Sequence, residues 1–357
     1  MPIPMKVVPG YFNSRPGIQV GTWYKGDVTV HDDDTVELDQ SHLRFLRQMG
    51  VEWVMVATVP RFSARIFKSL RQAFEAEGLK LFRVGYNRLH QMPPITLNLE
   101  GRDKMIEDYL RYINDLGEAG LHYATYGHVA NGIWRGLERR PVRGGATAGG
   151  LDLEKPMRAG KMGYPGEFYE LPLSYGREYG KEELWENFYY FVDKLVPVLE
   201  KSGVFLGVHP SDPPVYTFGG VPRHIFGTFE GYKQALDYAN SPNFGACLCV
   251  GSWLEGGGAI GCTPEEFIRY FGGRKKLFKL HVRNVTAPLS APGGFNETFP
   301  DAGYGDLISV IKTLDEIGFD GPIINDHLID MVGAYHAAEA YFTAYLKGMT
   351  DAVQHGK

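Results

Sequence analysis

Hydrophobic and polar positions along the chain follow two alternating periods. Short runs rich in β-branched and aromatic residues recur, separated by longer segments with apolar residues every three or four positions. The short runs predict buried strands, and the longer segments predict amphipathic helices. We predict strands at residues 18–22, 53–57, 79–84, 122–126, 205–208, 244–249, 277–282 and 322–325. We predict helices at residues 36–49, 64–77, 105–119, 182–201, 232–238, 264–270, 307–317 and 331–346.

Eight strands that alternate with helices indicate a parallel α/β sheet, and eight is the number that closes into a (β/α)8 TIM barrel. The alternative is an open doubly wound sheet, which normally carries a G-x-G-x-x-G turn after its first strand. The segment GTWYKGD at residues 21–27 does not match that turn. We therefore expect a single TIM-barrel domain over residues 1–357. A long Gly- and Arg-rich segment, residues 127–180, follows the fourth strand, and we expect this insertion to form a lid over the C-terminal mouth.

Composition narrows the function classes. The 357 residues are 44% hydrophobic and 22% charged, which is typical of a globular protein with a sizeable core. The net charge of −5 argues against nucleic-acid binding, and we interpret the arginines at 135, 139, 140 and 143 as a solvated loop. No stretch of 18 apolar residues predicts a membrane span, and the N-terminus lacks the apolar region of a signal peptide. The three cysteines form no disulfide framework, so we expect a cytoplasmic protein.

Residues that can bind a metal end the last four predicted strands. They are His209, Cys249, His281 and Asp326. Each has an ordinary explanation when taken singly, because a histidine can be a satisfied polar residue and a cysteine a small buried one. The C-terminal ends of barrel strands meet at one mouth, so the four would converge there. This mixed donor set favours Mn²⁺, Fe²⁺, Co²⁺ or Zn²⁺ over the oxygen-preferring Mg²⁺ and Ca²⁺, and the ion could act as a Lewis acid.

Further polar residues lie close to these candidates in the sequence. Arg283 follows the histidine of LHVRNV by two positions, so it could pair with a substrate carboxylate or with an acid of the protein. His327 directly follows the last candidate ligand and could be a general acid or base, or a partner of a ligand. Tyr335 could reach the mouth or pack in the core, and Asp212 is expected to fix its loop. Aromatic side chains that could face a sugar ring, or simply pack, are Trp23, Tyr24, Tyr86, Trp134, Tyr164 and Trp253.

Several of these motifs resemble the mannonate dehydratase family, which belongs to the xylose-isomerase-like barrels. The matching segments are GVHPSDPPV (207–215), GGVPRHIFGTFEGY (219–232), CVGS (249–252), HVRNV (281–285) and the pair Asp326–His327. They agree with the family in order and spacing across the C-terminal half of the chain. The resemblance implies a metal-dependent lyase that dehydrates D-mannonate to 2-keto-3-deoxy-D-gluconate, a step in hexuronate catabolism.

The same resemblance assigns roles to residues. It implies an Mn²⁺-type site formed by His209, Cys249, His281 and Asp326. It also implies that His327 and a C-terminal tyrosine, matched to Tyr335, transfer protons, although it does not decide which of them is the acid. Arg283 would hold the carboxylate of the sugar acid. Barrels of this class commonly associate as dimers or tetramers, so we expect a homo-oligomer.

The sequence departs from the family in its loops. Pro300 stands where the family's Phe-x-Glu-x-x-His run has histidine, and Leu328 replaces the glycine of Asp-His-Gly. The segment 128–150 does not look like the family's fourth loop, and the N-terminal half matches weakly. Metal ligands are retained while substrate-facing loops differ. Three functions therefore remain open, namely a dehydratase for a sugar acid, a metal-dependent isomerase or epimerase of a keto sugar, and a sugar-binding barrel without catalysis.

Overall fold

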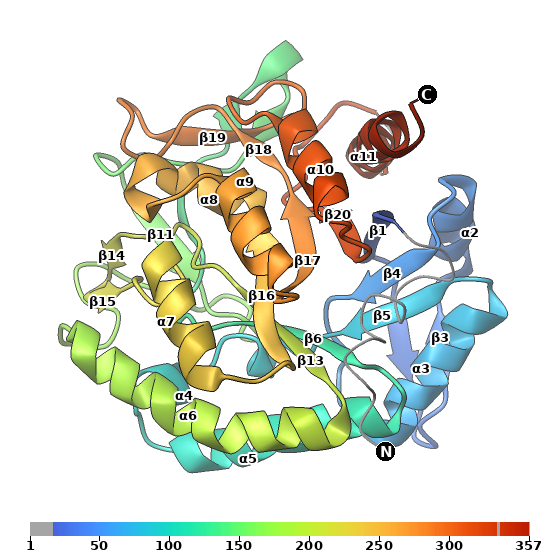
Figure 1. The fold of residues 1–357 in the computed structure, drawn as a ribbon, viewed down its shortest axis with the longest axis horizontal. Coiled ribbons are helices and arrows are strands. Elements are labelled where there is room, and N and C mark those ends of the chain that lie inside the picture. Colours follow the sequence, from blue (N-terminus) through green and yellow to red (C-terminus); the bar gives the residue numbers. More distant parts are fainter. Residues whose placement is uncertain (1–16, 334–335, 357) are drawn as a thin grey trace.

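An eight-stranded parallel sheet lies at the centre of the computed structural model, which describes residues 17–333 and 336–356 (Figure 1). Its strand order is β5-β4-β1-β20-β17-β16-β13-β6. The end strands β5 and β6 lie against each other, so the sheet forms a nearly closed barrel and the TIM-barrel prediction is confirmed. The strands are β1 (Gln19–Tyr24), β4 (Trp53–Val56), β5 (Lys80–Val84), β6 (Tyr123–Gly127), β13 (Phe205–His209), β16 (Phe244–Cys249), β17 (Leu277–Val282) and β20 (Pro322–Asn325).

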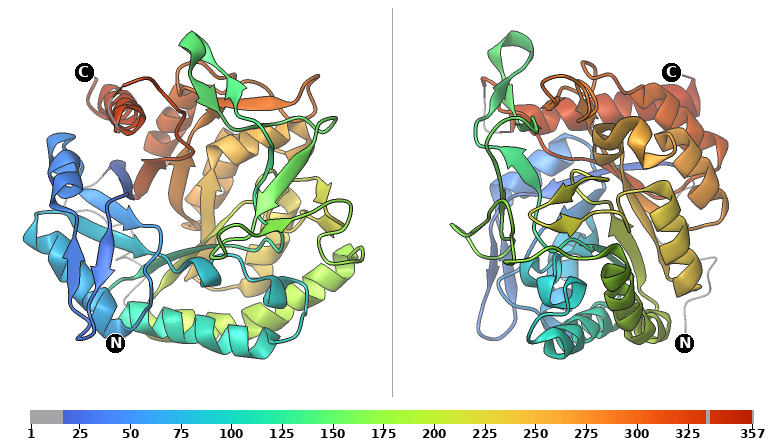
Figure 2. Two further views of the ribbon diagram at one scale, coloured as in Figure 1. Left: turned by 180° about the vertical axis from the view of Figure 1, so that it is seen from behind. Right: turned by 90° about the vertical axis from the view of Figure 1, so that its left-hand side faces the viewer.

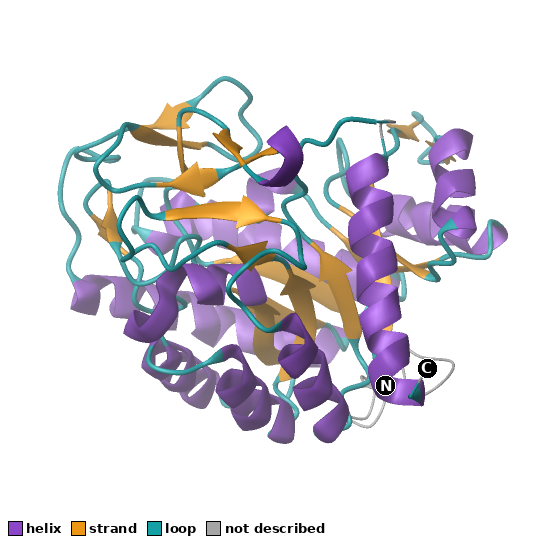
Figure 3. Cartoon of the chain, turned by 90° about the horizontal axis from the view of Figure 1, so that it is seen from above, coloured by secondary structure: helices purple, strands orange, loops and turns teal. Residues whose placement is uncertain are grey.

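Helices pack around the outside of this sheet (Figure 3). The longer ones are α2 (Gln40–Gln48), α3 (Ala64–Ala76), α5 (Arg102–Glu118), α6 (Lys181–Ser202), α7 (Phe229–Ala239), α10 (Leu307–Glu316) and α11 (Ala337–His355). Shorter ones are α4 (Pro93–Thr96), α8 (Val250–Gly256) and α9 (Pro264–Phe267), and α9 continues as a π-helix over Ile268–Gly272. Buried apolar faces of these helices and the outer face of the strands form the main core.

Two predicted helix starts are wrong. Residues 36–38 belong to β3 (Val36–Leu38), which pairs antiparallel with β2 (Val28–Val30). The helix begins only after Asp39, whose side chain caps it by accepting a hydrogen bond from the Ser41 amide. The last helix was expected from residue 331 but begins at Ala337. Gly333 has a φ of +132°, which no helix accommodates.

Short strands fill the segment after β6. They are β7 (Trp134–Gly136), β8 (Arg140–Pro141), β9 (Thr147–Ala148), β10 (Gly150–Leu151), β11 (Met157–Gly160) and β12 (Phe168–Tyr169). Strand β10 pairs with β19 (Phe295–Thr298), which in turn pairs with β18 (Asn284–Val285), just beyond β17. The green segment therefore lies beside the orange one in Figure 2. This pairing places β10, within residues 127–180, next to the segment that follows the C-terminal end of β17.

A separate group of buried side chains fills the barrel interior. It comprises Trp53, Met55, Phe82, Tyr123, Phe205, Phe278 and Ile324, with Trp23 packed against it. They come from six strands around the sheet, and Phe205 on β13 contacts Phe278 on β17, a strand that is not its neighbour. The interior is therefore a packed floor beneath the C-terminal mouth.

Candidate active site

The four candidate metal ligands come together at the mouth of the barrel. His209 ends β13, Cys249 ends β16, His281 lies one residue before the end of β17, and Asp326 follows β20 directly. One ligand atom from each residue lies within 4.8 Å of the others. The grouping arises from register, because Cys249 is directly opposite His281 in the ladder between β16 and β17. Parallel strands that end at the same level thus bring four distant residues to one point.

The contacts within this group fit a divalent cation. Nε2 of His209 lies 3.2 Å from Nδ1 of His281, which is 3.3 Å from Oδ2 of Asp326. The Cys249 sulfur lies 3.7 Å from the same carboxylate oxygen. Nδ1 of His209 donates to the Pro210 carbonyl at 2.8 Å, which leaves Nε2 free to coordinate. Nitrogen, sulfur and oxygen atoms that face one another in this way could together hold a divalent cation.

Burial changes the protonation of two of these side chains. It raises the pKa of the Cys249 thiol to about 12 and lowers the pKa of His281 well below its ordinary value. Without a cation, the thiol therefore keeps its proton at neutral pH. Because a metal binds the thiolate, loading the site would release that proton.

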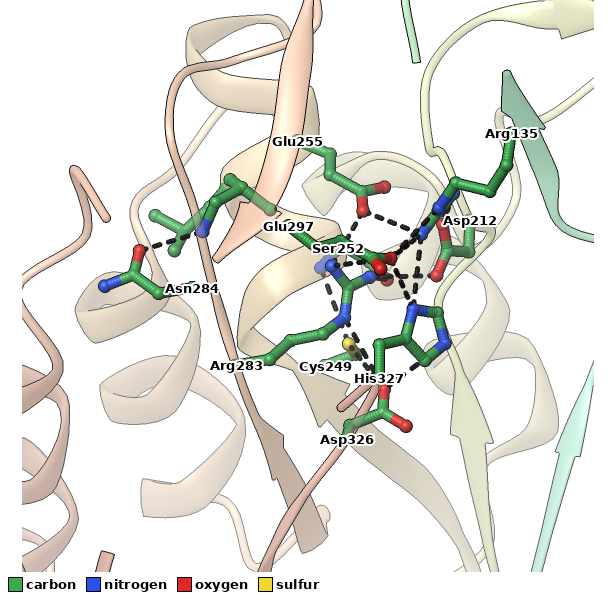
Figure 4. Close-up of polar contacts among 12 residues, drawn as sticks. Arg135, Asp212, Cys249, Ser252, Glu255, Arg283, Asn284, Glu297, Asp326 and His327 are labelled. Atoms are coloured by element: carbon green, nitrogen blue, oxygen red, sulfur yellow. Dashed lines mark hydrogen bonds and ion pairs between the residues drawn. The ribbon is translucent and has the colours of Figure 1, made fainter. Parts of the chain in front are cut away.

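Arg283 lies beside the ligands within a network of carboxylates (Figure 4). Its guanidinium donates to Glu255 at 2.8 Å and to Asp212 at 2.9 Å, and its Nε is 3.5 Å from Oδ2 of Asp326. The side chain is only 1% exposed. Protein carboxylates enclose the group, so this placement does not favour the expected contact with a substrate carboxylate. It does support the expectation that Asp212 fixes its loop, because Asp212 also pairs with Arg135 at 2.6 Å.

Arg135 is a member of this network that the sequence did not indicate. Its guanidinium lies 3.0 Å from Glu255 and 2.8 Å from Glu297, in addition to its contact with Asp212. Our interpretation of this arginine as part of a solvated loop is therefore wrong. Burial raises the pKa of Glu255, and the two arginines beside it act in the opposite direction.

His327 lies where the network meets the cavity. Its Nδ1 lies 2.6 Å from Oε1 of Glu297 and 3.4 Å from Nη2 of Arg135. Burial alone would lower the pKa of this imidazole, but the carboxylates of Asp326 and Glu297 raise it to about 9. Its φ of +44° is a left-handed conformation that residues other than glycine rarely adopt. Such strain is concentrated at functional sites, where surrounding contacts hold it in place.

A cavity of about 160 Å³ opens onto these groups. The residues of the predicted site that line it are His209, His281, Asp326, Asp212 and His327. Arg83, His90, Lys279 and Trp23 also line it, as do Gly132, Ile133 and Met162 of the segment after β6. Of the expected aromatic residues, Trp23 faces this cavity, Tyr24, Tyr86 and Tyr164 line a wider opening beside it, and Trp134 and Trp253 are packed in the core. Tyr335 lies outside the described residues.

Comparison with known proteins decides the family. The family model described as D-mannonate dehydratase (UxuA) matches residues 166–357. The mannonate dehydratase of Thermotoga maritima is 32% identical over 330 residues, which covers 82% of this chain and 86% of the relative. The chain belongs to the mannonate dehydratase family. A further relative, the mannonate dehydratase of Streptococcus equi subsp. zooepidemicus, is 30% identical over 72% of each chain.

Solved structures agree with the fold of this mannonate dehydratase family member. The mannonate dehydratase from Streptococcus suis serotype 2 superimposes with a TM-score of 0.75 at 22% identity, covering 96% of this chain and 95% of the other. The D-psicose 3-epimerase from Clostridium cellulolyticum H10 has a TM-score of 0.51 at 14% identity, covering 94% and 95%. At such identities the likeness shows the fold alone, a xylose-isomerase-like barrel.

Membership defines the reaction class. The mannonate dehydratase relatives are hydro-lyases, so the chain is an enzyme of that class and acts as a sugar-acid dehydratase. Within residues 17–333 and 336–356, no helix is both long and apolar enough to cross a membrane.

Proposed function

We propose that this enzyme is a metal-dependent dehydratase that converts D-mannonate to 2-keto-3-deoxy-D-gluconate. The observation that carries the proposal is the convergence of His209, Cys249, His281 and Asp326 within 4.8 Å. Three of these residues and His327 line the same cavity. Further support comes from the names of the relatives, which are mannonate dehydratases. The four residues would hold Mn²⁺, with Fe²⁺, Co²⁺ and Zn²⁺ as alternatives. The expected context is hexuronate catabolism.

Dehydration of a hexonate removes the hydrogen on C2 and the hydroxyl on C3, and the resulting enol becomes the 2-keto-3-deoxy acid. A bound divalent cation supplies Lewis-acid stabilisation of negative charge on substrate oxygens. His327 is held at Nδ1 by Glu297, and the carboxylates of Glu297 and Asp326 favour its protonated form. Its cavity position suits it to give a proton to the departing hydroxyl, which leaves as water. Tyr335 remains the candidate for the other proton transfer.

We also propose that residues 127–180 cover the mouth and exclude water during the reaction. Gly132, Ile133 and Met162 line the cavity, and Arg135 reaches the carboxylates next to the ligands. The segment would thus act both as a lid and as a source of one charged side chain. A single domain over the whole chain, assembled as a dimer or tetramer, completes the proposal.

Removal and restoration of the metal test the function directly. Chelated enzyme should lose turnover of D-mannonate, and added Mn²⁺ should restore release of a 2-keto-3-deoxy acid, measured by a thiobarbiturate colour assay. A metal-loaded protein that turns over no hexonate would remove D-mannonate as the substrate. Isomerised sugar without loss of water would instead favour an isomerase or epimerase.

Two cysteines on one strand give a matched test of the ligand set. Cys249→Ser should lose most of its bound metal, because a hydroxyl replaces the thiolate, whereas Cys247→Ser should keep it. Both side chains are fully buried on β16, but only Cys249 belongs to the cluster. Elemental analysis of the purified proteins measures the difference. Equal metal content in the two variants would exclude Cys249 as a ligand.

A further inference from the structure

Two cationic side chains line the active-site cavity and have no carboxylate partner in the part of the chain that the structure describes. Arg83 on β5 is 3% exposed, and Lys279 on β17 is fully buried. The Arg83 Nη1 reaches the Val56 carbonyl only at 3.5 Å, and its Nε has no hydrogen-bond partner among the described residues. Lys279 Nζ contacts the Met55 sulfur at 3.5 Å. Within the described chain, no carboxylate lies within the 4.0 Å ion-pair distance of either cation.

Both cations meet at Trp23, next to a candidate metal ligand. The Arg83 guanidinium carbon lies 5.4 Å from the centre of the Trp23 ring, and Lys279 Nζ lies 5.6 Å from it. The same ring stands edge-on to the His281 imidazole at 6.0 Å. Lys279 precedes His281 by two positions on β17, so the two side chains share one face of the strand. The two charges therefore converge on one region of the cavity, beside the candidate metal centre.

The absence of a side chain at Gly85 leaves room for the Arg83 guanidinium. A side chain at Gly85 would meet the Arg83 guanidinium nitrogens at 2.9 and 3.0 Å and the Ala57 carbonyl at 2.0 Å. Lys279 extends across the barrel interior, where its Nζ lies 5.8 Å from the Tyr123 ring and 5.9 Å from the Phe82 ring. The ammonium is thus enclosed by aromatic walls, with little polar contact from the protein.

Burying a cation without a counter-ion is unfavourable, because the charge loses its hydration. The other arginines of the site avoid this cost, since Arg135 and Arg283 are each surrounded by carboxylates. Around the cavity, the proposed divalent cation, the thiolate, the four carboxylates of the network, these two arginines and His327 would carry charges that largely cancel. The charges of Arg83 and Lys279 are left over, so the site as a whole favours an anionic ligand.

We propose that Arg83 and Lys279 form the subsite that binds the carboxylate of the sugar acid. This inference rests on the proposed function for the nature of the ligand, and it transfers to these two residues the role expected of Arg283. A carboxylate placed there would supply the missing counter-charge, and an arginine fork can bind it through two hydrogen bonds. The adjacent carbons of the sugar acid would then lie toward the metal ligands and His327.

Binding of a charged and a neutral probe tests the subsite without need of turnover. The probes are D-gluconate and D-glucitol, which have the same carbon number but differ in the carboxylate. Titration calorimetry would compare metal-loaded wild type with Lys279→Met, Arg83→Met and the surface control Arg274→Met. In the first two variants, affinity for gluconate should fall about tenfold to a hundredfold, as expected for loss of a hydrogen bond to a charged group. Affinity for glucitol should not change, and the control should bind both as wild type does.

Metal content and thermal unfolding establish that each variant is folded and loaded. Unchanged gluconate affinity in the folded variants would overturn the subsite, as would an equal loss for both probes. If wild type binds gluconate through these residues but dehydrates no hexonate, the subsite stands and the D-mannonate assignment falls. If wild type dehydrates D-mannonate and both variants keep its KM, the subsite falls and the proposed function stands.

Discussion

His327→Gln should lower the turnover of D-mannonate by a factor of about 10² to 10⁴, the range typical for loss of a general acid or base, and leave the bound metal in place. The imidazole lines the cavity and is held by Glu297 at 2.6 Å, yet it is not one of the four clustered ligands. Glutamine retains polar character but cannot deliver a proton at neutral pH. Single-turnover kinetics and elemental analysis of the same preparation measure the two effects together.

A histidine on the surface provides the control for this experiment. His31 is half-exposed in the β2–β3 hairpin, and His31→Gln should match wild type in both rate and metal content. Wild-type turnover in His327→Gln would remove this residue from the mechanism. Loss of metal together with loss of rate would instead make His327 a support for the ligands.

Arg283→Met should reduce the free energy of unfolding by about 3–5 kcal/mol, the range observed when one partner of a buried ion pair is removed. The variant leaves the carboxylates of Asp212 and Asp326 without the guanidinium that contacts both. Arg283→Lys should recover only part of the loss, because an ammonium cannot reproduce the planar fork. Urea unfolding monitored by circular dichroism measures these differences.

An exposed arginine gives the comparison for this prediction. Arg269 pairs with Glu316 at 2.9 Å, and both side chains are about half-exposed. Surface pairs contribute about 0–1 kcal/mol, so Arg269→Met should change stability little. An equally small effect for Arg283→Met would contradict the prediction, and would mean that the remaining residues of the network stabilise the carboxylates without Arg283.

The barrel was predictable because its strands are buried on both faces. Parallel strands of this kind form continuous apolar runs, and the predicted bounds 244–249, 277–282 and 322–325 agree with β16, β17 and β20. The error at residues 36–38 has a physical cause. A three-residue strand is too short to show its own period, and its apolar positions also fit the beginning of the amphipathic helix that follows.

The candidate site was predictable only where strand position constrains it. Strand ends meet at one mouth, so the four clustered ligands could be inferred from the sequence alone. Arg135 could not, because 162 residues separate it from Glu297 and no local spacing relates the two. Lys279 and Arg83 did carry a signal, since Lys279 is the one lysine or arginine within the apolar run LFKLHV, and Arg83 lies between Phe82 and Val84 in the buried part of KLFRV. A charge at a buried strand position requires a partner, and among the described residues no carboxylate lies within 4.0 Å of either cation.

The pairing of β10 with β19 also determines when the site can form during synthesis. Arg135 leaves the ribosome 162 residues before Glu297, and His327 follows later still. Until β19 has been made, the nascent segment after β6 lacks the strand partner of β10 and one of the three carboxylates that contact Arg135. The growing chain therefore carries an unfinished site until His327 has been made, and a product truncated before β20 would contain Arg135 and Glu297 but neither Asp326 nor His327.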